Sequence, residues 1–368
     1  MEFKIYHSFD DPVVKEAYAV LESKNDYELN AGYLWNKTWW EVFGSREDDE
    51  FLYQANLNIV LGSTKEGEIR LILPLVTRRK TFCGFINLRI LSICGDYWGA
   101  TFVDLLADSS VCEKDIVSLY NFINETIIYD WLWFTHVREG SLLLRQGNSC
   151  LQSACPMADL RHYADYEDYR KHNYSRHFKK NLRRRFRQVE EEKGAIRLEN
   201  YEGKNVPWKE VIRLSASKKM SQKSCLYHDK YKATFLKKII EEFPGHVLMI
   251  RVGEKLVSYR ISFAHKGCRY SMDTSYDRSF TQGLGILSMD MAVRDSFDKS
   301  LSFHCAGTGL DEYKFNFIHS IVPIYHILMA GNSLLGKLTV PIKWKKLKKD
   351  ERLVMDTIAL RNERYNVC

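Results

Sequence analysis

The segment between residues 247 and 305 constrains the fold most strongly, because its apolar pattern changes period in a fixed order. Apolar runs of strand length, separated by tight turns, are followed by a glycine turn, a stretch with helical period and a last apolar run. The predicted elements are strands at 247–252, 257–264, 268–274 and 301–305 and a helix at 283–297. Strands that form a meander beside a helix indicate an α+β fold, with a mixed sheet flanked by helices.

The first part of the chain shows the same mixture of helices and paired strands. Two alternating strands joined by a Gly/Glu turn predict a hairpin, with a helix on either side of it. The predicted elements are a helix at 13–21, strands at 57–61 and 69–76, a helix at 114–128 and a strand at 131–136. No internal repeat is evident from the sequence itself.

The length of 368 residues suits two domains. A polar, Gly-containing stretch at 139–149, with the segment up to Asp165, is the predicted boundary between them. We therefore expect an N-terminal domain at 1–160, a C-terminal domain at 161–340 and a basic tail at 341–368 that is helical.

The two predicted domains differ in charge. The whole chain has a net charge of +7, but residues 1–160 carry 14 basic and 23 acidic side chains, whereas the remainder carries 40 basic and 24 acidic ones. This asymmetry indicates that the second domain faces an anionic partner. A nucleic acid, a phosphorylated ligand and a membrane surface all fit this charge.

The cysteines and the apolar segments point to a cytosolic protein without a metal. Nine cysteines are scattered without a Cys-x-x-Cys pair or zinc-ligand spacing, which is typical of reduced thiols. The first residues lack the apolar core of a signal peptide. An uncharged window at 315–336 has the length of a membrane span, but it contains Pro323 and several polar residues. We expect a buried strand, a turn and a second apolar stretch there, and peripheral membrane contact stays open.

A strong helix is predicted at 173–192, with Gly194 ending it. Its apolar positions recur at spacings of four, four, four and three, which marks one buried stripe: Tyr174, Phe178, Leu182, Phe186 and Val189. Seven cations fall at 176–187. They form either a solvated face, with pairs such as Arg187 and Glu191, or a surface that contacts an anion.

Two segments could carry chemistry. The first, 273–286, runs from a strand through Tyr276 and Asp277 into the Gly283-Leu284-Gly285 turn, where outward amides at a helix N-terminus could hold a pyrophosphate. A plain turn is the alternative. The second, 307–317, follows a strand and places Tyr313 beside Lys314 within an aromatic run. A lysine that snorkels from a strand end is the alternative there.

These blocks together resemble the acetyltransferase domain of the GNAT superfamily over about residues 166–317. The likeness is to the cellulose-biosynthesis acetyltransferases of CelD or BcsL type and their FemABX-like relatives. The matching blocks are the Arg-rich helix at 175–184, the stretch from Tyr276 to Gly283, and the Gly-x-x-x-Tyr-Lys-x-x-aromatic pattern from Gly309 to Phe317. In the first part, residues 39–44, 73–75 and 95–97 resemble the acceptor-side half of such proteins. The resemblance therefore implies two tandem GNAT-like domains.

The resemblance also implies site residues and a co-substrate, acetyl-CoA or another acyl-CoA, with no metal. Backbone amides near Gln282, Gly283, Leu284 and Gly285 would bind its pyrophosphate. An amine or hydroxyl attacks a thioester carbonyl in such a reaction, so the site needs a proton acceptor and a proton donor. The implied roles are Asp273 as base, Tyr276 or Tyr313 as proton donor to the departing thiolate, and Lys314 as a cation that contacts the acceptor or its phosphate.

Three function classes stay open from the sequence. The first is N- or O-acyl transfer from acyl-CoA to a sugar, a polysaccharide precursor or a small molecule, with Trp40, Asp96 and Tyr97 binding the acceptor. The second is FemABX-like aminoacyl transfer from aminoacyl-tRNA to a cell-wall precursor, with tRNA or a phosphorylated precursor at 176–187. The third is a protein without catalytic activity that binds nucleic acid or a membrane surface through 176–187 and 337–352.

Overall fold

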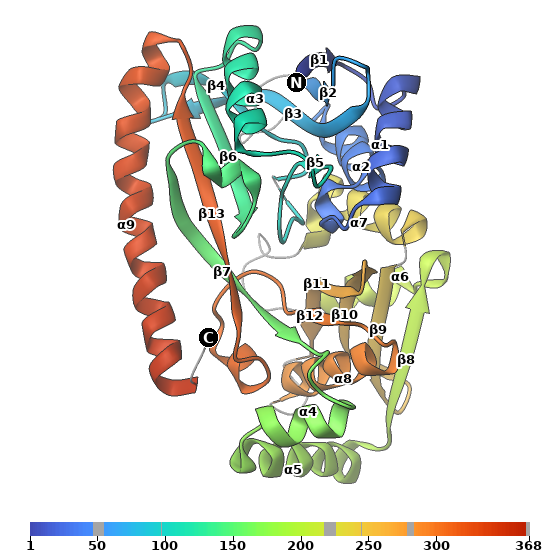
Figure 1. The fold of residues 1–368 in the computed structure, drawn as a ribbon. Helices are drawn as coiled ribbons and strands as arrows, with labels where there is room; N and C mark the ends of the chain where they lie inside the picture. Colours follow the sequence, from blue (N-terminus) through green and yellow to red (C-terminus); the bar gives the residue numbers. More distant parts are fainter. Residues whose placement is uncertain (47–54, 97, 217–225, 244, 278–282, 366–368) are drawn as a thin grey trace. The chain divides into compact units, whose positions relative to one another are not determined.

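The computed structural model describes residues 1–46, 55–96, 98–216, 226–243, 245–277 and 283–365. The chain divides into two compact units (Figure 1). Unit 1 comprises Met1–Ala154 and Val322–Thr357, and unit 2 comprises Cys155–Ile321 and Ile358–Cys368. The expected domains, 1–160 and 161–340, are continuous stretches, whereas each compact unit is assembled from two separate stretches of chain.

Unit 1 contains a mostly antiparallel sheet with helices against it. Its helices are α1 (Pro12–Lys24), α2 (Tyr33–Phe43), α3 (Glu113–Thr126) and α9 (Leu334–Tyr365), the last of which ends in unit 2. Its strands are β1 (Glu2–Tyr6), β2 (Asn56–Ser63), β3 (Ile69–Phe82), β4 (Ile86–Ile93), β6 (Trp131–Arg138) and β13 (Ile321–Ala330), with the short β5 (Leu106–Ala107) beside β3. The strand order is β1-β2-β3-β4-β6-β13, and every neighbouring pair is antiparallel except β4 and β6.

Unit 2 also contains a mostly antiparallel sheet. Its helices are α4 (Tyr166–Asn173), α5 (Arg176–Lys193), α6 (Trp208–Ala216), α7 (Lys230–Glu242) and α8 (Leu284–Asp298). Its strands are β8 (Ile196–Glu202), β9 (Gly245–Val252), β10 (Lys255–His265), β11 (Cys268–Tyr276), β12 (Phe303–Cys305) and the second part of β7 (Ser149–Asp159). The order is β8-β9-β10-β11-β12-β7, with β11 and β12 as the parallel pair.

The two sheets therefore share one plan. In each, a meander of three strands leads through a helix, α3 or α8, to a fourth strand that pairs in parallel with the third. The last strand of each sheet comes from elsewhere in the chain, because β7 follows β6 but pairs with β12, and β13 follows β12 but pairs with β6. This arrangement confirms the predicted α+β class with a mostly antiparallel mixed sheet flanked by helices.

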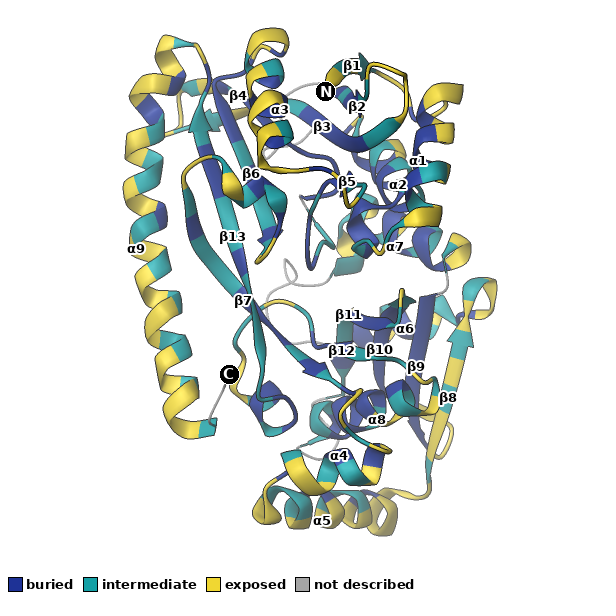
Figure 2. Cartoon of the chain, viewed as in Figure 1, coloured by how far each residue is buried: buried dark blue, intermediate teal, exposed yellow. Residues whose placement is uncertain are grey.

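The predicted elements appear close to their expected bounds. In α5, the N-cap Ser175 accepts a hydrogen bond from the amide of Phe178 (3.1 Å), and Gly194 ends the helix with a φ of 104°. Leu182 and Val189 are buried and pack with the core of unit 2, while the charged side of the helix is exposed (Figure 2). Within the described residues, 341–365 of the predicted tail lie in α9.

The uncharged window at 315–336 contains the whole of β13 and the start of α9, as the strand-and-turn interpretation predicted. None of the helices in the described ranges is both long and apolar enough to cross a membrane. Every cysteine within the described residues is a free thiol.

Candidate active site

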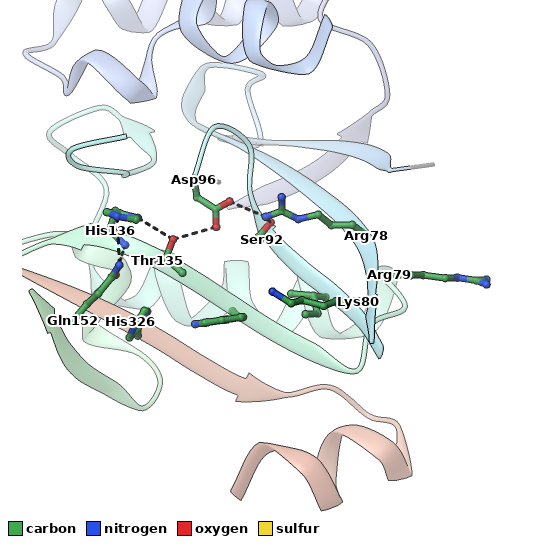
Figure 3. Close-up of a pocket in the computed structure, with 11 residues that line it drawn as sticks. Arg78, Arg79, Lys80, Ser92, Asp96, Thr135, His136, Gln152 and His326 are labelled. Atoms are coloured by element: carbon green, nitrogen blue, oxygen red, sulfur yellow. Dashed lines mark hydrogen bonds and ion pairs between the residues drawn. The ribbon is translucent and has the colours of Figure 1, made fainter. Parts of the chain in front are cut away.

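Asp96, one of the residues predicted to bind the acceptor, lines a pocket of about 280 Å³ in unit 1 (Figure 3). It lies just after β4, and its side chain is only 3% exposed. Arg78 on β3 donates to Asp96 Oδ1 (2.8 Å) and to Ser92 Oγ (2.7 Å). Burial raises the pKa of Asp96 to about 6, although Arg78 opposes this shift. The pocket thus contains a carboxyl group that titrates close to neutral pH.

The pocket lies where the parallel strands β4 and β6 diverge. Their pairing is limited to Ile90 with Trp131 and Leu91 with Leu132, and the pocket-lining residues Ser92 and Trp133 come directly after those pairs. Beyond the last pair, the strands no longer fill the space between them. A divergence of this kind leaves room for a ligand at the middle of a sheet.

Two histidines close one side of the pocket. Thr135 Oγ1 lies 3.0 Å from His136 Nδ1, and Gln152 Oε1 accepts a hydrogen bond from the backbone amide of His136 (2.7 Å). His136 has a φ of 59°, a left-handed conformation that non-glycine residues adopt mainly where the surroundings enforce it. Burial lowers the pKa of His136 to about 4 and that of His326, on β13, to about 3. Both rings are therefore neutral at pH 7.

Two lysines add positive charge beside the pocket. Lys80 lines it from β3, and Lys343 on α9 lies with its Nζ 4.2 Å from the ring centroid of Trp133, another lining residue. Neither ammonium group forms an ion pair within the described part of the chain. Lys80 contributes to lowering the pKa of Lys343, after burial and Lys346. The mutual repulsion of these cations would be relieved by an anionic ligand.

Trp40, a second predicted acceptor residue, lies in a different hollow of unit 1. It is on α2 and lines a space with His7, Asn58 and Thr77. The structure therefore places Trp40 and Asp96 in separate hollows rather than together. Tyr97, the third predicted residue, lies outside the described residues.

In unit 2, the predicted glycine turn begins α8. Gly283 is the N-cap with a φ of 122°, and its carbonyl accepts from the amides of Ile286 (2.9 Å) and Leu287 (3.0 Å). The amides of Leu284 and Gly285 belong to the first turn of the helix, where no preceding turn supplies carbonyl partners. Both residues thus sit at the positive end of the helix dipole. Gln282, the remaining residue predicted there, lies outside the described residues.

Arg185 from α5 reaches this helix start. A side chain on Gly283 would collide with the Arg185 guanidinium, which fits glycine at this position in addition to the positive φ. No carboxylate is paired with Arg185 among the residues that the structure describes. A cation at the positive end of a helix is unfavourable by itself, so this arrangement suits a bound anion. The sequence placed Arg185 within the basic cluster but gave no signal that separated it from its neighbours.

Tyr276 lies beside the same turn. A Cβ atom on Gly285 would be 3.1 Å from the Tyr276 ring, so the ring packs against the backbone of the first turn of α8. Tyr276 ends β11, and Gly285 follows it after a short connection. The structure thus brings together two residues that the sequence motif had placed in one block.

Asp273 projects from β11 toward the other face of the sheet. The register changes between the pairs Ile261 with Asp273 and Ser262 with Ser271, which leaves Met272 as an extra residue on β11. Tyr259 on β10 donates its hydroxyl to Asp273 Oδ2 (2.7 Å). Because Tyr276 packs on α8, the alternation of the strand places the two predicted residues on opposite faces of β11.

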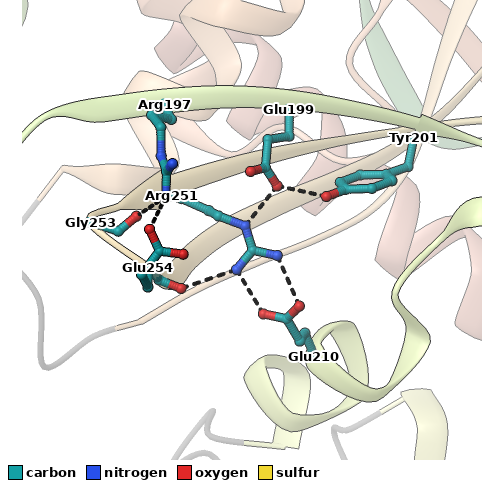
Figure 4. A network of polar contacts seen from close by, with 7 residues as sticks. All are labelled: Arg197, Glu199, Tyr201, Glu210, Arg251, Gly253 and Glu254. Atoms are coloured by element: carbon teal, nitrogen blue, oxygen red, sulfur yellow. Dashed lines mark hydrogen bonds and ion pairs between the residues drawn. The ribbon is translucent and has the colours of Figure 1, made fainter.

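Helix α6 covers the face on which Asp273 lies, and an ion-pair network holds this helix to the sheet (Figure 4). Arg251 on β9 donates to both carboxylate oxygens of Glu210 on α6 (2.8 and 2.9 Å) and to Glu199 on β8 (2.6 Å). Tyr201 donates to the same Glu199 oxygen (2.8 Å). Such bidentate contacts fix the helix in place, so the network has a structural role.

Tyr313 is in contact with a buried arginine on the α8 side of the sheet. Its hydroxyl interacts with Arg260 on β10, whose side chain is 3% exposed and whose pKa is lowered by burial. Arg260 Nε also lies 3.4 Å from Ser288 Oγ on α8, but Arg260 Nη2 is buried without a hydrogen-bond partner in the described structure. A buried unpaired donor of this kind is costly and suits a site that awaits an acceptor group.

Lys314 is buried and its ammonium group is fully occupied. Nζ donates to the carbonyl oxygens of Gly307 (3.1 Å), Thr308 (2.9 Å) and Gly309 (3.0 Å) and lies 3.4 Å from Asp311 Oδ2. An ammonium group has three hydrogens to donate, so these carbonyls use all of them. Lys314 therefore fixes the loop that follows β12, and Tyr313 is positioned by that same loop.

Comparison with known proteins fits this geometry. Residues 176–315 match the model of the acetyltransferase (GNAT) domain. This stretch includes the Arg-rich helix, the meander, the glycine-led helix and the Tyr313 segment. By this match, residues 176–315 of unit 2 resemble a GNAT acetyltransferase domain.

Solved structures extend the likeness of the GNAT fold to both units. The structure of L-PGS from Bacillus licheniformis is 11% identical, with 94% of this chain and 97% of that one covered and a TM-score of 0.54. FemX is 8% identical over 89% of this chain and 98% of its own, with a TM-score of 0.55. A tandem GNAT protein from the clavulanic acid biosynthesis pathway is 10% identical, with 90% of this chain and 100% of that one covered and a TM-score of 0.51. No curated protein matches the sequence.

Proposed function

We propose that this chain is a GNAT-type acyltransferase that moves an acetyl or other acyl group from acyl-CoA to an amine or hydroxyl. The observation that carries the proposal is the start of α8, where Gly283 and Gly285 bring backbone amides next to the Arg185 guanidinium, which has no acidic partner among the described residues. Amides and a cation at one helix N-terminus form a site for a pyrophosphate that needs no metal. The family match over 176–315 supports the same donor.

The chemistry assigned to unit 2 follows from the bonds that change. The nucleophile loses a proton as it attacks the thioester carbonyl, and the carbon–sulfur bond then breaks to release a thiolate that gains a proton. Tyr276 is the proposed proton donor, because it packs on the turn that would hold the donor, and Tyr313 is the alternative. Asp273, which the resemblance implied as base, lies on the face of β11 opposite to Tyr276 and accepts a hydrogen bond from Tyr259, so it is not proposed as the base of this site. Lys314 acts as a positioning residue for the loop at 307–309.

The acceptor is assigned to the pocket around Asp96 in unit 1. Its surplus of cations over carboxylates, with Lys80, Lys343 and Arg78 against Asp96, favours an acceptor that carries an anionic group. A phosphorylated sugar or polysaccharide precursor has that character, in keeping with the resemblance to the CelD or BcsL type. Lys80→Gln, which removes one of these cations, is expected to weaken acceptor binding without changing the affinity for the acyl donor.

A thermal-shift panel tests the donor. Acetyl-CoA, longer acyl-CoAs and an aminoacyl-tRNA are added in turn to the purified full chain, and the melting temperature is recorded. A donor that binds only the folded protein raises Tm in proportion to the logarithm of its concentration above Kd. We expect acyl-CoA to stabilise the chain, and stabilisation by none of the three contradicts the transferase assignment.

Aminoacyl transfer is the second candidate, because α5 exposes a row of cations. Arg176, Lys180, Arg183, Arg184 and Arg187 are all exposed, and within the described residues only Arg187 has an acidic partner, Glu191 at 3.7 Å. Such a row could follow a nucleic-acid backbone, and the fold is shared with FemX. Binding of tRNA would fall steeply with salt, whereas acyl-CoA held by amides would depend on salt less strongly. Titrations at two salt concentrations separate the two donors.

A further inference from the structure

Helix α9 begins with an apolar face that is exposed to solvent. Leu334 is 73% exposed, Leu335 43%, Leu338 60% and Ile342 59%. The spacing of four residues between Leu334, Leu338 and Ile342 places them on one side of the helix. Soluble proteins expose single leucines routinely, but a contiguous row of four marks an interaction surface.

The opposite side of α9 is firmly packed, so the exposed face has a fixed position on unit 1. Thr339 is buried and accepts a hydrogen bond from Trp131 Nε1 (2.7 Å). Leu347 is buried in a cluster with Trp131 and Leu328, and Val340 and Trp344 pack against it. The α9 helix therefore has two apolar sides, and only one of them is used by the fold.

Two neighbouring segments add exposed apolar side chains beside this helix. Ile128 is 71% exposed and lies two residues before Asp130, whose carbonyl is so close to Gly336 that a side chain there would collide with it. Phe85 is 78% exposed at the tip of the β3–β4 hairpin, whose Phe82 and Ile86 pack in the same cluster as Trp344. We define the α9 face as Leu334, Leu335, Leu338, Ile342, Ile128 and Phe85.

The same stretch of helix is strongly basic. Between Leu334 and Lys349 there are six lysines and no acidic residue: Lys337, Lys343, Lys345, Lys346, Lys348 and Lys349. Of these, Lys337, Lys345, Lys346 and Lys349 are exposed. An apolar row flanked by lysines is the pattern of helices that lie in the interface of an anionic membrane.

We propose that the α9 face docks unit 1 onto an anionic lipid surface. Leucine, isoleucine and phenylalanine side chains would enter the boundary between headgroups and acyl chains, and the exposed lysines would contact lipid phosphates. A second copy of this chain fits the face poorly. If two such faces met, the six lysines of one copy would lie against the same six lysines of the other, and the like charges would repel. The proposal is independent of the acyl donor and of the transferase assignment.

Co-sedimentation of the full chain with vesicles tests the proposal. Vesicles of phosphatidylcholine alone are compared with vesicles in which part of it is replaced by phosphatidylglycerol. We expect binding to the anionic vesicles, little binding to the neutral ones, and weaker binding at high salt because exposed charges are screened. Equal binding to both vesicle types, or no binding to either, overturns the proposal.

Matched variants locate the contact. The double variant Leu338→Glu, Ile342→Glu should lose vesicle binding, whereas Leu198→Glu, which changes an exposed apolar side chain on β8 outside the face, should keep it. Each of Lys345→Gln and Lys349→Gln should weaken binding about fivefold, from about 1 kcal/mol per lysine near the surface. Circular dichroism checks that all variants are folded. Retained binding by the glutamate variant overturns the proposal, as does a dimer in sedimentation velocity that this variant abolishes.

Discussion

At the scale of single residues, the structure separates side chains that look alike in the sequence. Lys314 and Lys180 are both lysines in segments that resemble family motifs, but Lys314 is buried under three carbonyl groups and Lys180 is exposed. Burial decides the difference, because a buried ammonium must satisfy every donor it has. The two residues should therefore respond very differently to the same substitution.

Replacing Lys314 by Met should destabilise the protein. The carbonyls of Gly307, Thr308 and Gly309 would lose their donor, and the loss of these hydrogen bonds to a charged group costs about 3 kcal/mol together. Urea unfolding of Lys314→Met should show a lower midpoint, whereas Lys180→Met should leave the midpoint unchanged. If Lys314→Met retains both its stability and full transferase activity, the positioning role is wrong.

His326 should make the stability of unit 1 depend on pH. Its folded pKa of about 3 lies below the value in the unfolded chain, so between these values the unfolded state holds one more proton. Stability is therefore lost as the pH falls below about 6.5, with a slope of up to about 1.4 kcal/mol per pH unit from this residue. His326→Gln should reduce the measured slope between pH 6 and pH 4.5, and equal slopes in the two proteins contradict the buried neutral ring.

At the scale of elements, the apolar pattern of α5 predicted which side of the helix is buried, but it did not predict what each cation on the helix contacts. The stripe of Leu182 and Val189 packs against the core, and the pair Arg187 with Glu191 forms as its spacing predicted. The cations on the same helix, however, make different contacts. Lys179 Nζ donates to the carbonyls of Arg170 and Lys171 (3.4 and 3.2 Å) near the end of α4, whereas Arg185 reaches the start of α8.

Arg185→Ala should weaken binding of an acyl-CoA more than any neighbouring change on α5. A hydrogen bond between charged groups contributes about 1.5–3 kcal/mol, so the affinity should fall roughly tenfold to a hundredfold. Arg184→Ala removes the same charge one position away from an exposed site and is the matched control. Isothermal titration with acetyl-CoA measures both, and an equal loss for the two variants would show that only the overall charge matters.

Within the strands, the spacing of two predicted residues decides where they point. Asp273 and Tyr276 are three positions apart on β11, so the alternation of the strand puts them on opposite faces, where Asp273 meets Tyr259 and Tyr276 meets Gly285. The bulge at Met272 lies before both residues and does not change this relation. The sequence motif grouped Asp273 with Tyr276 without applying this alternation.

At the scale of the whole molecule, the last strand of each sheet comes from a distant part of the chain. Unit 1 is completed by β13, which lies beyond all the strands of unit 2 in sequence, and unit 2 is completed by the second part of β7. A sheet that lacks its last strand exposes an unpaired edge and part of its core. Neither unit is therefore complete within one continuous stretch.

Fragments cut at the expected domain boundary should fail to fold. Residues 1–160 lack β13 and α9, whose Leu328 and Leu347 pack with Trp131 in unit 1, so we expect this fragment to aggregate or to show no cooperative thermal transition. Co-expression with a second fragment that carries residues 161–368 should rescue solubility, because it supplies both missing elements. A 1–160 fragment that is soluble and melts cooperatively would contradict the conclusion that unit 1 needs β13 to complete its sheet.

The sequence by itself determined the elements of unit 2 and indicated a resemblance to GNAT acetyltransferases, because local period, caps and glycine turns act over a few residues. The helix at 173–192, the meander at 247–274 and the glycine start of α8 all appear where they were predicted. The tertiary structure alone decided which strand closes each sheet, that Asp96 lines the pocket of His136 and His326, and that Arg185 reaches Gly283. These outcomes depend on contacts between residues far apart in the chain, and no local pattern encodes such contacts.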